Sequence, residues 1–308
     1  MKRILVVGSS NTDMIIRVPR IPRPGETILG GEFSMAPGGK GANQAVAAAR
    51  AGGRVTFLAR VGEDVFGARA IANFEADGID VRFIMRDGRA PSGVALINVA
   101  ASGENSISVA SGANALLAPE DMQGAERAFE GADIVLMPLE TPMETVRAAA
   151  RIARLRGIPV ILNPAPAQPL EDDLLRSVSV ITPNESEVEI LTGIKAGTAA
   201  GADQAAASLR ARGPRLVIIT MGDRGCFVAG DGFITMVPAF QVTPVDTTAA
   251  GDIFNGALAV ALAEKTPLAA ALRFASAAAA LSVMKLGAQP SAPTRQEIEG
   301  FLALNSRG

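Results

Sequence analysis

The feature that most constrains the fold of this chain is an alternation of short apolar runs with alanine-rich amphipathic stretches. Apolar runs of strand length occur at 55–59, 134–137, 160–162, 178–181 and 216–220. Helical patterns lie between and after them, at 41–51, 65–77, 142–156, 202–212, 250–264 and 267–285. Strands that are apolar on both faces need helices on both sides of their sheet. The alternation therefore predicts a three-layer α/β/α fold with a mostly parallel sheet.

The charge and the missing residue types exclude several functions. The chain has 29 basic and 31 acidic residues, a net charge of -2, so no overall positive field attracts a nucleic acid or an anionic membrane. We therefore expect neither as a partner. Histidine is absent, which excludes Ser-His-Asp triads, histidine-bound metals and histidine bases. Any acid–base chemistry must use Asp, Glu, Lys or water.

The single cysteine and the N-terminus bear on where the protein works. Cys226 follows Gly225 and precedes apolar residues, a pattern that predicts a buried strand thiol. One cysteine cannot build a disulfide framework, which favours a reducing, cytoplasmic location. The first apolar run, at 4–7, is too short for a signal peptide or a spanning helix and predicts a first buried strand.

Two segments, at about 12–35 and 92–110, interrupt the alternation. They contain strand-like runs at 14–18, 93–99 and 106–110, joined by turns rich in Gly, Pro and Asn. We expect them to form a small β-sheet lid inserted in a single domain that spans residues 1–308. Such a small sheet exposes one apolar face, and pairing with a second copy would cover it. The pattern therefore predicts a homodimer through the lid.

A loop of small residues that leads into a helix is the first candidate for chemistry. Ala249, Ala250 and Gly251 precede Asp252 and the apolar helix pattern. Backbone N–H groups in such a loop can approach an anion, and the helix dipole favours negative charge there. Asp252 could accept a proton from a hydroxyl that attacks a bound phosphate. Considered alone, however, an Asp at a helix start is more commonly a cap.

A second Gly-rich turn, at 36–45, also opens a helix. Its Lys40 lacks the spacing of a P-loop, and no G-x-G-x-x-G follows a strand, so both P-loop and Rossmann sites are excluded. Together, the segments 38–43 and 246–252 resemble the two signature motifs of the ribokinase-like, or PfkB, family of carbohydrate kinases. Similar segments follow in the family's order at 8–13, 60–67, 163–167, 182–187, 220–225 and 285–291. The resemblance implies an ATP-dependent small-sugar kinase, with ribose as the expected sugar.

The resemblance also implies a role for each matching residue. The sugar would be bound by Asn11, Thr12, Asp13, Gly39, Lys40, Gly41, Ala42, Asn43, Glu140 and Asp252. Asp252 would be the base, and the anion hole would comprise Ala249, Ala250, Gly251 and Asp252. ATP would contact Asn184, Thr220, Met221, Gly222, Asp223, Arg224, Gly225, Gly251, Asp252 and Ser276. Glu187 would lie near Mg²⁺, and K⁺ would lie at Asp246, Thr248, Ser282, Lys285, Gly287 and Ser291.

Several of these residues have a simpler structural explanation, which the sequence leaves open. Asn11 and Asp13 could form an Asx turn after the first strand. Lys40 could be a surface lysine, and Glu140 could cap the helix that follows it. Asn184 could pair with a glutamate three residues later in a capping box.

The assignment also leaves alternatives at the level of function. Ile253 stands where the family motif usually has Thr, and Ser276 occupies a variable place. The sugar could instead be fructose, deoxyribose, a nucleoside or a phosphosugar. A sugar-binding protein that has lost catalysis is a further alternative, although Asp252 and the small residues before it are retained.

Overall fold

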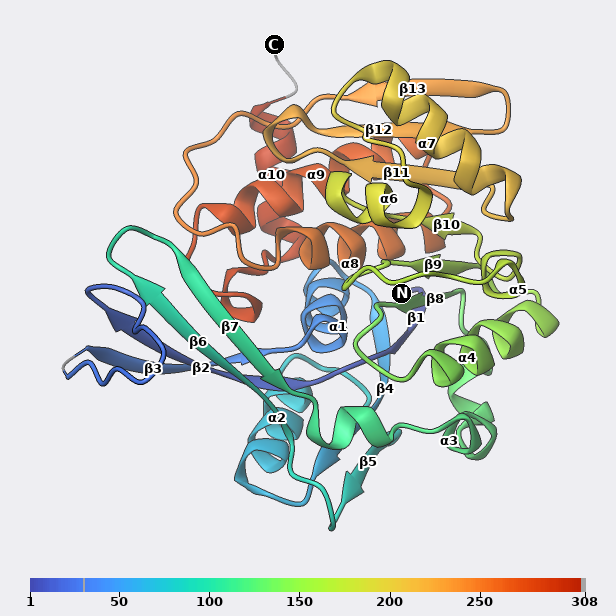
Figure 1. Cartoon of the computed structure of the whole chain (residues 1–308). Helices are drawn as coiled ribbons and strands as arrows, with labels where there is room; N and C mark the ends of the chain where they lie inside the picture. The colour runs from blue at the N-terminus through green and yellow to red at the C-terminus, as the bar shows by residue number, and fades with distance from the viewer. Residues whose placement is uncertain (30, 306–308) are drawn as a thin grey trace.

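The computed structural model describes residues 1–29 and 31–305. Its centre is a nine-stranded sheet with helices on both faces (Figure 1). The strand order is β13-β12-β11-β10-β9-β8-β1-β4-β5. The strands are β1 (Arg3–Val7), β4 (Arg54–Gly62), β5 (Ile84–Asp87), β8 (Ile134–Met137), β9 (Val160–Leu162), β10 (Val180–Ile181), β11 (Leu216–Thr220), β12 (Cys226–Gly230) and β13 (Phe233–Val237). All neighbours pair in parallel except β11 with β12 and β12 with β13.

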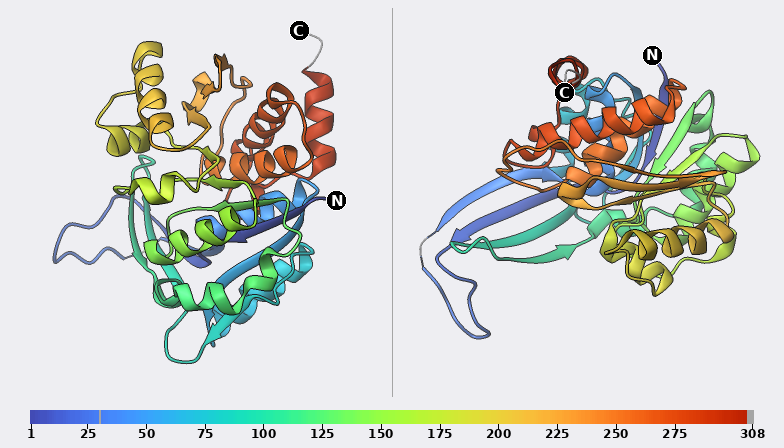
Figure 2. Two further views of the ribbon diagram at one scale, coloured as in Figure 1. Left: turned by 90° about the vertical axis from the view of Figure 1, so that its right-hand side faces the viewer. Right: turned by 90° about the horizontal axis from the view of Figure 1, so that it is seen from above.

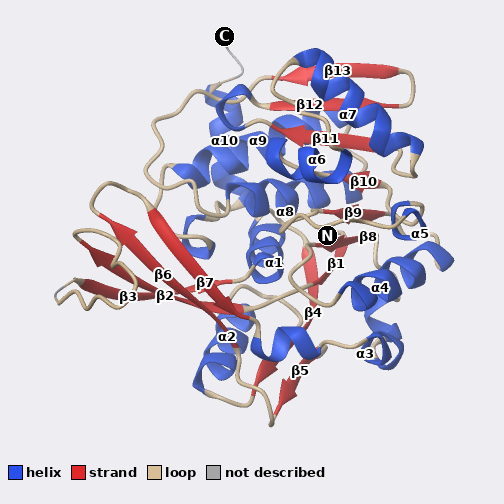
Figure 3. Cartoon of the chain, viewed as in Figure 1, coloured by secondary structure: helices blue, strands red, loops and turns tan. Residues whose placement is uncertain are grey.

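The helices form the two outer layers (Figure 3). They are α1 (Lys40–Arg50), α2 (Val65–Ala76), α3 (Pro119–Gly124), α4 (Met143–Leu155), α5 (Asp172–Leu175), α6 (Glu185–Thr192), α7 (Ala199–Ala211), α8 (Ala250–Ala263), α9 (Leu268–Val283) and α10 (Arg295–Leu304). Successive β1 residues point to opposite faces, so Ile4 and Val6 pack with α1, α8 and α9, whereas Leu5 and Val7 pack with α4 and α7. The sheet therefore separates two apolar cores, which confirms the three-layer fold.

Small residues bring α1 and α8 close together. A Cβ at Gly256 of α8 would lie 2.6 Å from the Ala47 Cβ and 2.7 Å from the Gln44 carbonyl oxygen of α1. Any side chain at Gly256 would thus force the helices apart. The close approach lets side chains from the first turn of α1 reach the first turn of α8.

A second sheet projects from one side of the α/β body (Figure 2). It contains four strands in the order β3-β2-β6-β7, namely β3 (Glu32–Gly38), β2 (Asn11–Val18), β6 (Gly93–Ala100) and β7 (Asn105–Ala110). The register places Asp13, Ile97 and Ile107 on one face and Met14, Met35 and Leu96 on the other.

The strand and helix patterns predicted from the sequence are largely confirmed, with shifted ends. The run at 178–181 forms only the two-residue strand Val180–Ile181, and the second sheet begins at Asn11 and extends to Gly38. Cys226 lies buried in β12, as predicted, and burial raises its thiol pKa to about 12. In the part of the chain that the structure describes, no helix combines the length and apolar character needed to cross a membrane.

Candidate active site

The carboxyl ends of the parallel strands gather most of the predicted site residues at one edge of the sheet. Glu140 follows β8, Asn163 follows β9, Asn184 follows β10, and Thr220 ends β11. Side chains at this edge meet because parallel strands all end there, which is the usual ligand-binding edge of α/β sheets.

Asn11 is held in place by a buried amide that the sequence did not reveal. Asn114 donates from Nδ2 to Asn11 Oδ1 at 2.8 Å and to the Ser10 carbonyl oxygen at 3.1 Å, while its Oδ1 accepts from the Ser10 N–H at 2.9 Å. A Cβ at Gly93 would lie 2.1 Å from Asn11 Oδ1, so only glycine fits beside this amide. Asn11 and Asp13 lie within strand β2, not in an Asx turn.

Glu140 anchors the N-terminus of α1. Its Oε2 accepts from the Lys40 N–H at 2.9 Å and from the Ser9 hydroxyl at 2.5 Å. Gly39, which precedes the helix, has φ 88, and a Cβ there would lie 2.7 Å from the Asn11 nitrogen. Glu140 therefore caps α1, which is distant in sequence, and not the helix that follows it.

Asp13 carries a strongly perturbed carboxyl beside Gly38. Burial, and then the charge of Glu140, raise the Asp13 pKa from its usual 3.8 to about 6. A Cβ at Gly38 would lie 2.3 to 2.4 Å from the Asp13 carboxyl atoms, so glycine makes the room that this carboxyl occupies.

Asp252 lies at the start of α8, is 4% exposed, and does not cap its own helix. The cap position is Ala249, and both Asp252 oxygens accept bonds from α1: Oδ2 from Asn43 Nδ2 at 3.0 Å and Oδ1 from Gln44 Nε2 at 2.9 Å. Burial raises the pKa of Asp252. The charge of Lys40 and the bonds from these two amides lower that pKa. The carboxylate is thus pointed across the α1–α8 contact.

Lys40 is surrounded by carboxylates. Burial alone would lower its pKa, but the charges of Asp252, Glu140 and Glu187 raise it above its ordinary value. Lys40 is therefore not the solvated surface lysine that the sequence allowed. One cation and three carboxylates instead form a charge cluster at the site.

The start of α8 is where the sequence predicts an anion cradle of backbone N–H groups. Ala249 adopts φ 60, an αL conformation that is uncommon for a residue with a side chain. Thr247 accepts weakly from the Ala250 N–H at 3.3 Å, and a Cβ at Gly251 would meet no atom within 4 Å, so the first turn is open on that side. The geometry fits a phosphate oxygen.

Asn184 and Glu187 form the capping box that the sequence allowed. The Asn184 N–H donates to Glu187 Oε2, and the Glu187 N–H donates to Asn184 Oδ1, both at 2.8 Å. Burial raises the Glu187 pKa, with Lys40 lowering it and Asp252 raising it. Glu187 thus both caps α6 and faces the charge cluster.

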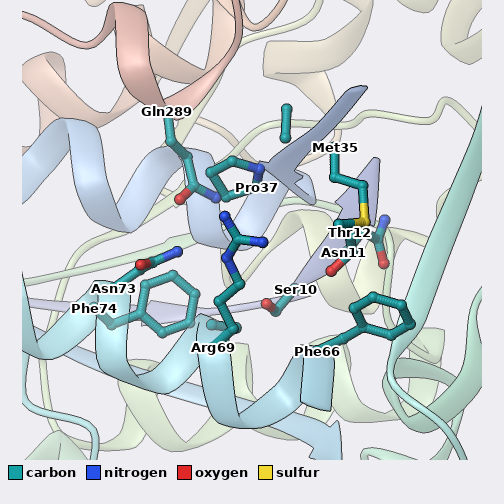
Figure 4. A pocket seen from close by; sticks show the side chains of 12 residues that line it. Ser10, Asn11, Thr12, Met35, Pro37, Phe66, Arg69, Asn73, Phe74 and Gln289 are labelled. Atoms are coloured by element: carbon teal, nitrogen blue, oxygen red, sulfur yellow. The ribbon is translucent and has the colours of Figure 1, made fainter. Parts of the chain in front are cut away.

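Two cavities border Asn11. One, of about 360 Å³, is lined by Asn11, Glu140, Thr141 and Val109 among others. The other, of about 30 Å³, lies between β2, β3 and α2, with Phe66 and Arg69 in its wall (Figure 4). The larger cavity has room for a small polyol.

Comparisons with known proteins agree with this geometry. The model of the pfkB family carbohydrate kinases matches residues 1–295. The chain belongs to this family. A curated ribokinase of Haemophilus influenzae is 46% identical over 98% of this chain and 98% of its own length, and a curated deoxyribokinase of Salmonella typhi is 38% identical over 98% and 99%. The structure of Arabidopsis thaliana ribokinase complexed with ribose and ATP matches at TM-score 0.92 and 33% identity, covering 98% of each chain.

The nucleotide residues that the family motifs suggest lie around the β11 end. Thr220, Met221 and the short turn Gly222–Arg224 lead to Gly225, where φ is 98 and a Cβ would lie 2.0 Å from the Val237 carbonyl oxygen. The turn carries Asp223, and Arg224 pairs with Glu185. Ser276 lies on α9.

The predicted monovalent cation residues are partly brought together. Asp246 Oδ1 accepts from the Thr248 N–H and hydroxyl at 2.9 and 2.6 Å, and Oδ2 accepts from the Gly287 N–H at 2.8 Å. Ser282 and Ser291 instead donate their hydroxyls to Ala279 and Ala288, and Lys285 pairs with Glu297. The Asp246 carboxylate offers the hard oxygen atoms that a cation such as K⁺ requires.

The departure at Ile253 has a simple explanation. Its side chain is 1% exposed within the core between α1, α8 and the sheet. A hydroxyl there would lie in an apolar environment, so Ile253 serves packing and leaves the backbone cradle intact.

Proposed function

We propose that this protein transfers the γ-phosphate of ATP to D-ribose, giving ribose 5-phosphate and ADP, with Asp252 as the general base. The observation that carries the proposal is the position of the Asp252 carboxylate. It is buried beside the open first turn of α8 and held on both oxygens by α1, the helix whose first residue is Lys40. A hydroxyl between Asp252 and a phosphate in the cradle would have its proton acceptor on one side and its electrophile on the other.

The chemical step needs little basicity from Asp252. In a loose phosphoryl-transfer transition state the hydroxyl proton leaves late, so a carboxylate that is correctly placed suffices. The proton moves to an Asp252 oxygen, and the sugar oxygen bonds to phosphorus as the bond to ADP breaks. Burial favours the protonated form of Asp252 after this transfer, whereas the charge of Lys40 favours the ionised form, so that Asp252 can release the proton to water once product has left.

The sugar would be oriented by the predicted polar residues, of which Asn11 and Glu140 line the larger cavity. Asn11, Asp13 and Glu140 supply acceptors for sugar hydroxyls, and Lys40 supplies a donor. The fixed amide of Asn11 and the tight fit at Gly93 restrict how the sugar can lie.

The donor residues fit a magnesium nucleotide and a monovalent activator. Glu187 would lie near a bound Mg²⁺, which would supply positive charge to offset the charge that develops on the transferring phosphate. K⁺ would bind beside Asp246 and shape the loop that leads to the cradle. Asp223 and Gly225 would border the adenosine.

The small sheet would act as a lid and as a dimer interface. The face that carries Asp13 lies toward the sugar cavity, which Val109 lines. The opposite face exposes Phe33 (62%) and Leu96 (53%), and a second copy would cover them.

A panel of sugars tests the proposal. ADP release is measured with ribose, deoxyribose, fructose and adenosine at equal concentration, and ribose is expected to give the highest kcat/KM. A tenfold preference for another sugar, about 1.4 kcal/mol, would reject ribose but keep the kinase. Sugar binding without ADP release would instead support a non-catalytic binding protein.

A further inference from the structure

We propose that Gln44 is a positioning residue that fixes the Asp252 carboxylate for proton acceptance, and that Asn163 in turn fixes Gln44. The inference rests on the proposed role of Asp252 and assigns to the reaction two residues that the sequence did not suggest.

Gln44 donates both of its amide protons in hydrogen bonds. It is fully buried, and its Nε2 donates to Asp252 Oδ1 at 2.9 Å and to Asn163 Oδ1 at 3.0 Å. A primary amide nitrogen has two protons, so both donors are used. The Gln44 side chain therefore links the first turn of α8 to the end of β9.

The direction of this chain of bonds is fixed by its far end. Asn163 Nδ2 donates to the Thr182 carbonyl oxygen at 3.3 Å, and a carbonyl can only accept. Asn163 must therefore turn its oxygen toward Gln44. Asp252, when ionised, also only accepts, so the Gln44 amide has one orientation that satisfies both neighbours.

That orientation has a cost that a purely structural residue would avoid. Gln44 Oε1 is buried and has no hydrogen-bond partner among the described residues. Buried polar atoms without partners are rare because their lost hydration is not replaced. An apolar side chain at this position of the α1–α8 contact would avoid the cost, and what the amide supplies in return is its two N–H donors.

The Asn43 and Gln44 donors favour the ionised form of Asp252 and fix the orientation of its carboxylate. Asn43 holds Oδ2 and Gln44 holds Oδ1, which stops rotation of the carboxylate. The other charged groups that face Asp252 are Lys40 of α1, which favours its ionised form, and Glu140 and Glu187, which disfavour it. Because two carboxylates and burial oppose ionisation, loss of the Gln44 donor would shift the balance toward the protonated, non-basic form.

The test compares the pH dependence of ribose phosphorylation in matched variants. Gln44→Met keeps the size of the side chain and removes its donors. We expect kcat/KM at pH 7 to fall about tenfold or more, as for loss of a bond to a charged group. The acid limb of the kcat/KM profile, which reports the base in the free enzyme, is expected to move to higher pH. ATP affinity should stay within about twofold.

A second variant, Asn163→Leu, tests whether a residue that does not touch Asp252 still affects its carboxylate. Asn163 does not bond to Asp252 and would act on it only through Gln44. If this relay from Asn163 through Gln44 to Asp252 operates, the variant moves the acid limb to higher pH as well. The double variant should be no worse than Gln44→Met alone, because the second residue acts through the first. Should Gln44→Met not fold, the acid limb of Asn163→Leu alone decides the matter.

Thr145→Val is the matched control. Thr145 is buried in α4, and its hydroxyl donates to the Leu117 carbonyl oxygen, away from Asp252. It should lower Tm without moving the acid limb. If Gln44→Met and Asn163→Leu lower Tm but keep the parent acid limb, both residues are structural and the relay is wrong. If the parent releases no ADP with any sugar, the proposed function fails first, an outcome distinct from an active parent with unmoved variants.

Discussion

Asp13→Asn is expected to stabilise the protein while it weakens sugar binding. The Asp13 carboxyl lies in β2 beside Gly38, where burial and the Glu140 charge raise its pKa to about 6. A raised carboxyl pKa means that the folded protein holds the charged form at a cost. Asn has nearly the same shape and carries no charge, so the substitution removes that cost.

The magnitude follows from the two pKa values. Between the usual 3.8 and about 6 lie roughly two pH units, and at about 1.4 kcal/mol per unit the cost is about 3 kcal/mol. Because Asp13 is partly open to solvent, about 1–3 kcal/mol is the expected gain. The sign gives the pH window: the gain is full above pH 6, shrinks as pH falls, and vanishes below 3.8, where the carboxyl is protonated in both states.

Urea unfolding of the parent and of Asp13→Asn at pH 8, 5 and 4, without ligands, measures this gain. The same variant should raise KM for ribose about tenfold or more, because a hydroxyl bond to a carboxylate is stronger than one to an amide. A variant that is less stable than the parent at pH 8, or a gain that does not depend on pH, would refute the reasoning.

Three further predictions follow from the site and the second sheet. Gly38→Ala should displace Asp13 and raise KM for ribose tenfold or more, whereas Gly124→Ala, where a Cβ meets nothing within 4 Å, should not; steady-state kinetics of both variants decide it. K⁺ should raise kcat above that in Na⁺ or tetramethylammonium at constant ionic strength, and equal rates in the three salts would remove the cation site. Leu96→Asp should yield monomers in sedimentation velocity, whereas Ile107→Asp, similarly exposed on the opposite face, should leave the dimer intact; a parent that sediments as a monomer would contradict the interface.

The sheet was predictable where its strands are buried on both faces. The runs that became β8 and β9 are apolar throughout, and β11 is apolar up to its last residue, Thr220. Helices cover these strands on both faces, and a continuous apolar run is a strong local signal. The edge strand β13 was missed although its sequence, FITMV, is largely apolar. Most of its residues are exposed, so the run does not belong to a strand that helices cover on both faces. The Gly-Asp-Gly turn between β12 and β13 was a second local sign.

The candidate site was predictable only in part, for a different reason. Asp252 and Lys40 lie in short motifs that the sequence displays directly. The residues that orient the site do not: Asn114 bonds to Asn11 across 103 positions, and Gln44 bonds to Asn163 across 119. Such partners meet only in the folded chain, when the strands lie side by side in the sheet. No local sequence pattern therefore predicts them. Likewise, the cap explanation for Asp252 was wrong because its carboxylate reaches another helix.

The most direct test of the account is kcat for ribose in Asp252→Asn, measured beside Tm and ATP affinity. Asn keeps the size of Asp252, and its oxygen can accept from Gln44. Its NH₂ can donate to Asn43 Oδ1, which has no partner among the described residues, once the Asn43 amide turns over. It cannot take the hydroxyl proton. We expect kcat to fall by about 10² or more, the usual contribution of a positioned base, with ATP affinity and Tm maintained. A kcat within about threefold of the parent, in a variant that is equally stable and binds ATP equally well, would contradict Asp252 as the base and with it the proposed mechanism.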